Sequence, residues 1–389
     1  MAERLYIDFD AYIRQGEPDK REKASVWSTA IGLQAVDGLT TSEYLQETAR
    51  RNIEGEITID EAQQLINNYY ITKTVHNEND ADKEQADRVS SNIAKLLSSN
   101  TLNFSVFGYT QVHRNIFNGV FKFAGKIRDY DISKKEWVLH GDTVTYMYAA
   151  DLKLALEYDL EQERLFNYGG LSSDDIIAHV SRFTANLWQI HAFGEGNTRT
   201  TAVFVILYLR SLGFKANNDI FAQNSWYFRN ALVRYVYKNH DGVMPEPKYL
   251  ERFFRNMLLG EQWVLKNRYL ILNPPAEFCE QPRLDTPTST PTSTPTSTGQ
   301  THKEVVNQFW TDNDNILRVV RAIGCETMSV KDIMAAVQLK DRKNFMEYSL
   351  NPSLNEGFLR MLYPDSPRHP RQKYLLTVKG LGLYNQIKR

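Results

Sequence analysis

The sequence predicts a mainly α-helical protein with one small β-hairpin, followed by a small α+β domain at the C-terminus. Apolar residues recur at spacings of three and four over most of the chain before the last segment, which is the helical period. β-forming residues gather around His140-Gly141-Asp142, and a Thr/Pro/Ser run separates off the C-terminal part. At 389 residues the chain is longer than one core usually needs. We therefore expect two or three folding units.

Composition excludes several classes of protein. Hydrophobic residues make up 42% and charged residues 24%, close to the average for globular domains. No uncharged apolar run approaches the roughly 18 to 20 residues that span a bilayer, and the first residues lack the apolar core of a signal peptide. Cys279 and Cys325 lie far apart, which favours neither a disulfide framework nor a zinc site. We expect a cytoplasmic protein with no membrane partner.

A low-complexity run at Thr286–Thr298, TPTSTPTSTPTST, predicts an extended linker because Pro blocks helix and strand and nothing apolar can be buried. After position 300 the chain holds 14 Lys and Arg against 9 Asp and Glu, so its surface is more basic than the acidic remainder and suits different partners. We expect the C-terminal domain to be mobile on this linker. The predicted units are a helical segment (1–100), a central core (101–280), the linker (281–301) and a C-terminal domain (302–389).

Two helices are predicted on either side of a short polar break, HAFGEGNTR. Ser172, followed by acidic residues, starts the first helix, and apolar residues then line one face as far as Ile190. From Thr200 the next helix is apolar almost all round, which is typical of a helix in the middle of a bundle, and Gly213 ends it. Nearer the N-terminus, two further helical patterns meet at Glu54-Gly55.

The polar break carries the chemistry. Gly194 and Gly196 permit a loop whose N–H groups face one anion, and the following helix adds its unpaired amides and positive dipole end. Glu195 would hold Mg²⁺ that bridges phosphate oxygens, and Arg199 offers a forked cation. His191 has a pKa suited to a proton acceptor near neutrality.

Each of these residues also has an ordinary explanation. A histidine at a helix end usually packs or caps, a loop acid is usually solvated, and Gly-Asn is usually a turn. Here a base, a metal ligand, an anion loop and an arginine fall within nine residues, just before a buried helix. This combination favours a catalytic site.

The same residues resemble the signature of the Fic family, H-x-F-x-[D/E]-G-N-G-R-x-x-R, and the surrounding helices resemble the Fic bundle over about residues 105 to 240. The resemblance implies a Fic helical bundle with a β-hairpin flap, and a protein adenylyltransferase that moves AMP from ATP, with Mg²⁺ or Mn²⁺, to a hydroxyl of a target protein. The flap, Ile132 to Tyr146, would align an extended target segment.

The resemblance also implies a role for each matching position. His191 would deprotonate the target hydroxyl, Phe193 would anchor the loop, and Glu195 would bind the metal ion. The phosphates would contact Gly194, Gly196, Asn197, Thr198 and Arg199.

Three positions depart from the signature. Ala192 stands where many members have Pro, Thr198 replaces the second Gly, and Ala202 replaces the second Arg. In the family that second arginine pairs with an inhibitory glutamate.

The segment from Leu33 to Leu65 resembles the antitoxin domain that accompanies Fic toxins. LQAVDG aligns with its [S/T]-x-x-x-E-G motif and places Asp37 at the position of the regulatory acid. An offset alignment instead places Ser28 at the hydroxyl position and Gly32 at the acid position, which leaves no acid. The other interpretation is an ordinary two-helix subdomain that covers the bundle. Because Ala202 removes the usual arginine, we expect Asp37 to lack a matching partner unless another cation, such as Arg210, reaches the site.

After the linker, the order of elements resembles a winged helix: a helix, a turn near Leu339–Asp341, a second helix, and a two-stranded wing around Arg368–Tyr374. The candidate DNA contacts are Arg342, Lys343, Arg371 and Lys373. Winged helices also bind proteins, so both partners stay open.

The alternatives to adenylyl transfer are a DNA-binding regulator with a nucleotide-binding but catalytically weak Fic core, and a Fic enzyme that transfers another nucleotide or phosphate-containing group. The intact His191 argues against the regulator, because a nucleotide sensor needs no base.

Overall fold

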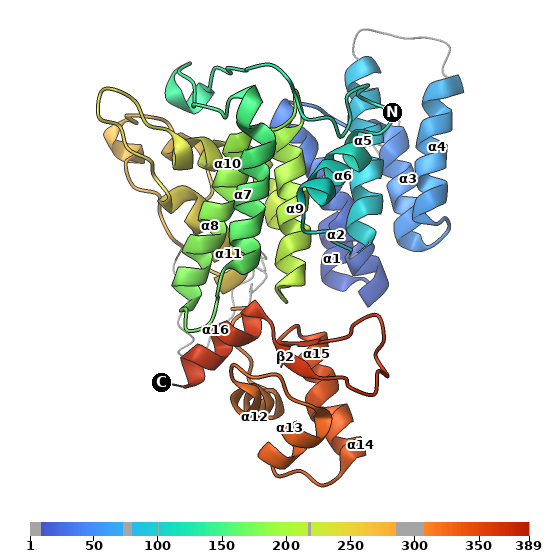
Figure 1. Ribbon diagram of the computed structural model, residues 1–389. Coiled ribbons are helices and arrows are strands. Elements are labelled where there is room, and N and C mark those ends of the chain that lie inside the picture. Colours follow the sequence, from blue (N-terminus) through green and yellow to red (C-terminus); the bar gives the residue numbers. More distant parts are fainter. Residues whose placement is uncertain (1–8, 73–79, 100, 217–218, 285–306, 389) are drawn as a thin grey trace, which may run out of the picture.

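The computed structural model describes residues 9–72, 80–99, 101–216, 219–284 and 307–388, and these are mainly helical, as predicted (Figure 1). None of the helices in these ranges combines the length and apolar character of a membrane span. The helices of the N-terminal and central parts are α1 (Phe9–Gln15), α2 (Pro18–Gly32), α3 (Glu43–Glu54), α4 (Ile59–Thr72), α5 (Asp80–Ser98), α6 (Val106–Phe117), α7 (Leu152–Leu165), α8 (Ser173–Ile190), α9 (Asn197–Ser211), α10 (Asp219–Val236) and α11 (Lys248–Leu259). Short 3-10 turns are η1 (Leu33–Asp37), η2 (Trp137–Leu139), η3 (Ala149–Asp151), η4 (Asn267–Tyr269) and η5 (Ala276–Phe278).

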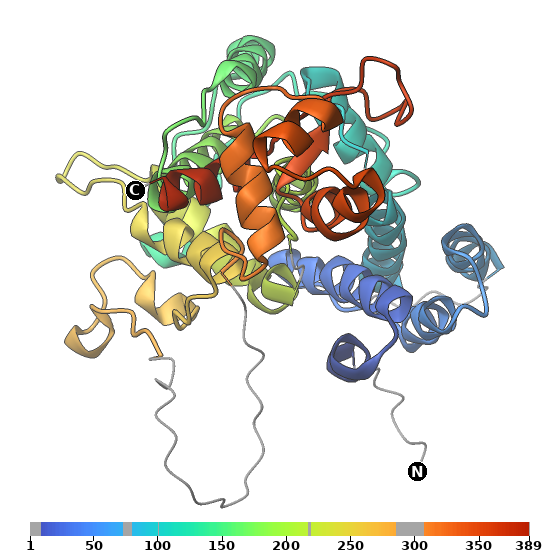
Figure 2. The same ribbon diagram turned by 90° about the horizontal axis from the view of Figure 1, so that it is seen from below.

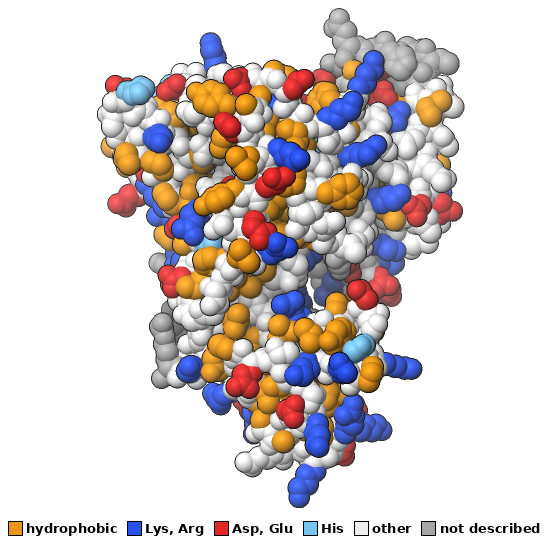
Figure 3. All heavy atoms as spheres, viewed as in Figure 1, with side chains coloured by type: hydrophobic (Ala, Val, Ile, Leu, Met, Phe, Trp, Pro, Cys, Tyr) orange, Lys and Arg blue, Asp and Glu red, His pale blue; other side chains and the backbone are white. Residues whose placement is uncertain are grey.

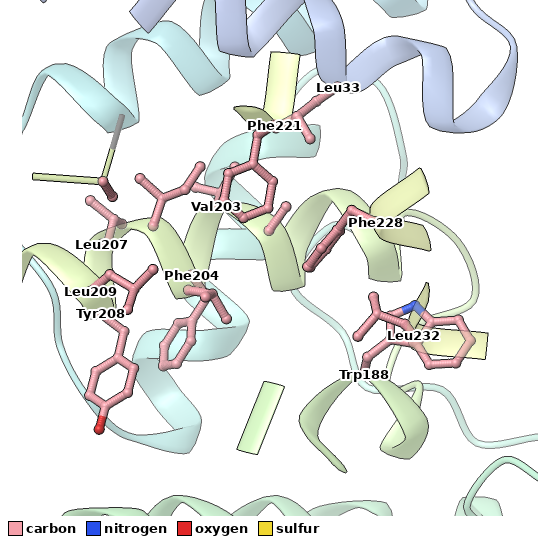
Figure 4. Packing of buried hydrophobic residues seen from close by; sticks show 14 of the residues in the cluster. Leu33, Trp188, Val203, Phe204, Leu207, Tyr208, Leu209, Phe221, Phe228 and Leu232 are labelled. Atoms are coloured by element: carbon pink, nitrogen blue, oxygen red, sulfur yellow. The ribbon is translucent and has the colours of Figure 1, made fainter. Parts of the chain in front are cut away.

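The helix α9 lies at the centre of the bundle. Every side chain from Asn197 to Leu209 is buried, and α9 packs against α5, α6, α8 and η1. Figure 4 shows Val203 and Phe204 of this helix among side chains from other elements, including Phe221 and Leu33. The prediction of a helix buried on all sides is confirmed, and this burial fixes the loop that precedes the helix.

The helices before and after the polar break have the predicted ends. Ser172 caps α8 through a capping box with Asp175, and the left-handed Gly213 (φ 94°) follows the C-terminus of α9. In the N-terminal part, Gly55 terminates α3 in the left-handed conformation. The sequence therefore predicted the helix start at Ser172 and the helix ends at Gly55 and Gly213 correctly.

The N-terminal helices share one hydrophobic cluster with the central helices. Trp27 on α2 is fully buried and donates to Asn52 Oδ1 at 3.0 Å. At Gly32, a Cβ would lie 2.5 Å from the Cα of Ala222 on α10, so α2 and α10 touch backbone to backbone. Figures 1 and 2 show α1 to α4 along one side of the bundle. This segment completes the core that positions α9.

The predicted β-hairpin reverses direction as expected but forms no strand pair among its described residues. The amide of Glu136 donates to the carbonyl of Asp142 at 2.8 Å, and η2 with left-handed His140 and Gly141 makes the turn. The Glu136 carboxylate points inward, where Arg229 on α10 donates to it at 2.7 Å. A buried ion pair therefore anchors the flap where a strand ladder was expected.

The C-terminal domain has its own hydrophobic cluster. Its strands pair antiparallel and lie on either side of the segment predicted as the wing, so Arg368 to Lys373 belong to the connection between them. The elements are α12 (Asp314–Ile323), α13 (Val330–Ala336), α14 (Arg342–Phe345), the π-helical turn η6 (Met346–Leu350), α15 (Asn351–Asn355), β1 (Leu359–Met361), β2 (Tyr374–Leu376) and α16 (Val378–Ile387). The α+β prediction is confirmed.

Figure 3 shows Lys and Arg side chains gathered on the C-terminal domain. Arg342 and Lys343 begin α14, Arg371 and Lys373 precede β2, and all four are exposed. No ion pair joins any of them to another described residue. Their contact with DNA stays a prediction.

The predicted linker falls in 285–306, outside the described residues. The C-terminal domain nevertheless contacts the core directly, which differs from the free movement expected of it. The amide of Lys379 donates to Leu212 O at 3.2 Å, and Asn385 donates to Leu171 O at 2.9 Å. At Gly213, a Cβ would lie 2.1 Å from the carbonyl oxygen of Gly357. The C-terminus of α9 is therefore in close contact with this domain.

Candidate active site

His191 ends α8 in the left-handed conformation, with φ 51° and ψ 56°. Its ring is 3% exposed and lies 4.1 Å from the ring of Tyr146. Nδ1 lies 3.3 Å from the carbonyl oxygen of Trp188, whereas Nε2 is buried without a hydrogen-bond partner among the described residues. A proton on Nδ1 would leave the Nε2 lone pair free to accept another. This is the arrangement that a general base requires.

Burial lowers the pKa of His191 well below its ordinary value, and the nearby Lys134 adds to this effect, followed by Arg128 and Arg229. Both causes disfavour the charged imidazolium. His191 is therefore neutral at neutral pH and able to accept a proton.

Arg128 ties the start of the HAFGEGNTR loop to the residues on either side of the flap. Its Nε donates to the carbonyl of His191 at 2.8 Å and its amide to the carbonyl of Ala192 at 2.9 Å. The other two guanidinium nitrogens donate to Tyr130 O at 2.5 Å and Met147 O at 2.6 Å. The sequence analysis missed this residue because its partners are backbone carbonyls, which leave no sequence signal.

His113 on α6 supports the loop through the carbonyl of Glu195 and the ring of Phe193. Its Nδ1 accepts from Gly125 N at 2.8 Å, so Nε2 carries the proton and donates to the carbonyl of Glu195 at 3.0 Å. The ring stacks on Phe193 with centroids 3.8 Å apart, and burial lowers the pKa of His113 to about 4. Phe193 is fully buried and anchors the loop, as expected. His113 was also missed, since it lies far outside the motif.

The two loop glycines are needed for different reasons. Gly196 has φ 77°, and a Cβ there would lie 2.2 Å from the ring of Phe117. Gly194 is not in the left-handed region. Instead, a Cβ on Gly194 would lie 2.5 Å from the hydroxyl of Tyr130. The expectation that both glycines supply a special backbone conformation is thus correct for Gly196 only.

The side chains of Asn197 and Thr198 point into the protein. The Asn197 amide accepts from Phe193 N at 2.9 Å and donates to Phe193 O at 2.7 Å, which clamps the loop. Thr198 Oγ1 accepts from the indole of Trp188 at 2.9 Å. These side chains hold the loop in place, so any phosphate contact must come from the backbone amides in the first turn of α9.

Glu195 is the loop residue with a solvent-accessible carboxylate, whose side chain is 44% exposed. It accepts from Gly196 N at 3.2 Å and from Lys134 Nζ of the flap at 3.3 Å. No cluster of three metal-ligating side chains occurs among the described residues. Mg²⁺ in phosphate-transfer sites is often held by one or two carboxylates together with substrate phosphates, so Glu195 fits this role with Lys134 displaced.

Arg199 is fully buried at the first turn of α9. Its Nη1 donates to Gln34 Oε1 at 2.9 Å, and its Nη2 lies 2.8 Å from the Asp37 carboxylate. That second contact is an ion pair without aligned hydrogen-bond geometry, since Nη2 and Nε have no hydrogen-bond acceptor among the described residues. The ring of Phe117 faces the guanidinium at 4.8 Å.

Asp37 therefore has a partner, and this partner is Arg199 and not the Arg210 that the sequence suggested. The turn η1 brings Gln34 and Asp37 to the same side, facing the first arginine of the motif, so the absent second arginine at Ala202 is not needed. Arg210, the substitute considered from sequence, donates to Leu97 O at 2.7 Å. Sequence comparison could not show this pairing because it depends on how η1 packs against α9.

Comparisons with known proteins agree with this site. Residues 104–209 match the Fic/DOC family, and residues 314–377 match the C-terminal domain of Fic-like proteins, described as filamentation induced by cAMP. The central part of the chain therefore contains a Fic/DOC domain, and the C-terminal part contains a Fic-like C-terminal domain.

One curated relative is the protein adenylyltransferase VbhT of Bartonella schoenbuchensis, 27% identical over 146 residues, which is 36% of this chain and 29% of the relative. The match thus spans less than a third of that protein. Among solved structures, a Fic family protein from Desulfovibrio desulfuricans has a TM-score of 0.42 at 15% identity, covering 94% of this chain and 90% of the other. The N-terminal Fic domain of an effector protein from Bartonella sp. AR 15-3 has a TM-score of 0.35 at 19% identity, covering 45% and 82%.

Replacing Asp37 by Asn should raise the affinity for Mg-ATP by roughly fivefold, because Arg199 loses a charged competitor in a partly exposed ion pair worth about 1 kcal/mol. The same variant should unfold at a lower temperature without nucleotide, since a buried cation is left uncompensated. Titration calorimetry measures the first effect and thermal unfolding the second. Asp82→Asn, an exposed acid on α5, is the control. Unchanged affinity in Asp37→Asn would show that the ion pair does not oppose nucleotide binding.

Proposed function

We propose that this chain transfers AMP from ATP to a side-chain hydroxyl of a target protein. The observation that carries the proposal is a neutral, buried histidine with a free Nε2, placed directly before a helix N-terminus that holds a buried arginine. A base beside an anion-binding helix end suits phosphoryl chemistry on a hydroxyl nucleophile. The adenylyltransferase relative supports AMP as the transferred group.

In the proposed reaction the target hydroxyl lies near His191 Nε2, which takes its proton. The hydroxyl oxygen then forms a bond to the α-phosphorus of ATP, and the bond from that phosphorus to the β-phosphate bridging oxygen breaks, so pyrophosphate leaves. Arg199 and the first-turn amides of α9 would bind phosphate oxygens and stabilise the developing negative charge. Mg²⁺ on Glu195, when bound, would neutralise charge on the phosphates.

Two contacts oppose this reaction in the present conformation. Lys134 of the flap pairs with Glu195, and Asp37 of η1 pairs with Arg199. Both catalytic groups are therefore neutralised by the protein itself. We infer that ATP and its metal ion must displace these partners before transfer. Because Asp37 belongs to the N-terminal segment, its ion pair with Arg199 would restrain activity.

His191→Ala should lower the transfer rate by about 10² to 10⁴-fold, the usual loss for a general base, while leaving ATP affinity unchanged. Transfer is followed with ATP labelled at the α- or γ-phosphate, and we expect only the α-label to become protein-bound. His240→Ala, which removes an exposed histidine, is the matched control. Incorporation of γ-label, or full activity in His191→Ala, would refute adenylyl transfer.

The pH dependence of kcat/KM reports the free enzyme's base. An ordinary histidine is half protonated at roughly pH 6.5, but the pKa of His191 lies well below that value. As pH falls from about 8 to about 6, His191 should stay deprotonated and kcat/KM should stay level, with the loss appearing only at lower pH. If kcat/KM instead falls by half near pH 6.5, and this fall disappears when a residue other than His191 is replaced, that other residue is the base.

A further inference from the structure

A groove of about 680 Å³ lies beside the active site. One wall is the extended segment 145–148, which begins within the last residues of the flap, and the end of α8 closes the groove at Ile190. The other wall is formed by Asp151 at the end of η3 and by a stripe of α7 at helical spacing, which comprises Leu154, Ala155, Tyr158 and Asp159.

Large apolar side chains on both walls of the groove are exposed. Leu154 is 67% exposed and Tyr158 is 63% exposed, while Tyr148 across the groove is 65% exposed. The opposite face of α7 already packs into the core through Leu156 and other leucines. The view in Figure 3 includes α7 and shows hydrophobic and acidic side chains at the surface of this region. A second apolar face on a helix that already has a core face suits a binding partner.

The groove ends close to the proposed base. Tyr146 lines the groove and its ring lies 4.1 Å from that of His191, while Ile190 directly precedes His191. Gln189 Nε2 donates to Thr145 O at 3.0 Å, which fixes the extended wall against α8. A ligand lying in the groove would therefore place its neighbouring residues close to His191.

The charges in the groove have one sign. Asp151 and Asp159 are its charged lining residues, and no Lys, Arg or His lines it. Asp159 is partly buried, and burial raises its pKa, yet it forms no hydrogen bond or ion pair with the described residues. A partly buried carboxylate of this kind is stabilised by a cation. Tyr148 and Tyr158 add aromatic faces that attract Arg or Lys.

We propose that this groove binds the target protein through an extended segment that carries a basic side chain and an apolar side chain close to the hydroxyl to be modified. The basic group would pair with Asp159, and the apolar group would cover Leu154 and Tyr158. The inference rests on the proposed transfer of AMP to a protein and assigns the recognition of that protein to α7.

The test measures binding without transfer. The full chain, fluorescently labelled and free of nucleotide, is applied to an array of 12-residue peptides with a central Ser, Thr or Tyr, in which flanking positions carry Arg, Glu, Leu or Ala. We expect peptides with Arg and Leu to bind at least tenfold more tightly than their Glu counterparts. Asp159→Asn should remove the preference for Arg, and Glu157→Gln, on the solvent side of α7, should keep it. Leu154→Ser should weaken binding of all peptides, whereas Leu165→Ser should not.

The remaining outcomes separate this inference from the proposed reaction. If α-label is transferred but the array shows no binding, no preference for Arg, or a preference that survives Asp159→Asn, the groove inference fails and the reaction stands. If the preference is present but no α-label is transferred, the reaction fails and the groove remains a peptide-binding site. Sedimentation of wild type and Leu154→Ser completes the test, because a dimer that dissociates in the variant would make the groove a contact between two copies and overturn the inference.

Discussion

The guanidinium of Arg199 is the charge around which this protein is arranged. It sits at the first turn of a helix that is buried on all sides, and removing a cation from water costs several kcal/mol unless other groups compensate. Burial lowers the pKa of Arg199, but an arginine in a protein stays charged. The ring of Phe117, the amide of Gln34 and the carboxylate of Asp37 supply the compensation. Two of these three groups come from η1, so the N-terminal segment contributes polar partners for Arg199 as well as apolar contacts to the core.

The same charge is what a nucleotide phosphate would use. One guanidinium cannot pair fully with Asp37 and with a phosphate, so stabilisation of the resting protein and binding of substrate oppose each other. Lys134 and Glu195 show the same competition between an internal ion pair and ligand binding. The Glu195 carboxylate, which suits a metal ion, is paired with a lysine of the flap. In the resting site, the candidate phosphate-binding and metal-binding groups are thus each paired with an opposite charge of the protein itself.

Local signals in the sequence predicted the elements that depend on local interactions. The cap at Ser172, the apolar stripe of α8 and the all-round burial of α9 follow from propensity and periodicity. The motif also identified His191, whose burial and free Nε2 suit a base. What could not be predicted depends on contacts between distant segments. Arg128 and His113 donate to backbone carbonyls that are distant in the sequence. Every residue has a backbone carbonyl, so such contacts leave no recognisable residue pattern.

Two of the differences between expectation and structure have the same origin. The flap was expected to pair as strands because of its β-formers, but the inward turn of Glu136 toward Arg229 replaces the ladder with an ion pair. Asp37 was expected to lack a matching partner because the aligned arginine is absent, but the chain fold presents a different arginine of the same motif. In both cases a buried charge found a partner that only the tertiary structure brings near.

The central claim is that η1 holds Arg199 in place of a nucleotide. Hydrogen–deuterium exchange of the backbone amides at 33–38, with and without Mg-ATP, tests it most directly, because exchange reports local opening. If ATP displaces Asp37 and Gln34 from Arg199, exchange in this turn should become faster on nucleotide addition while α9 becomes better protected. Unchanged or slower exchange at 33–38, with ATP bound, would contradict the account.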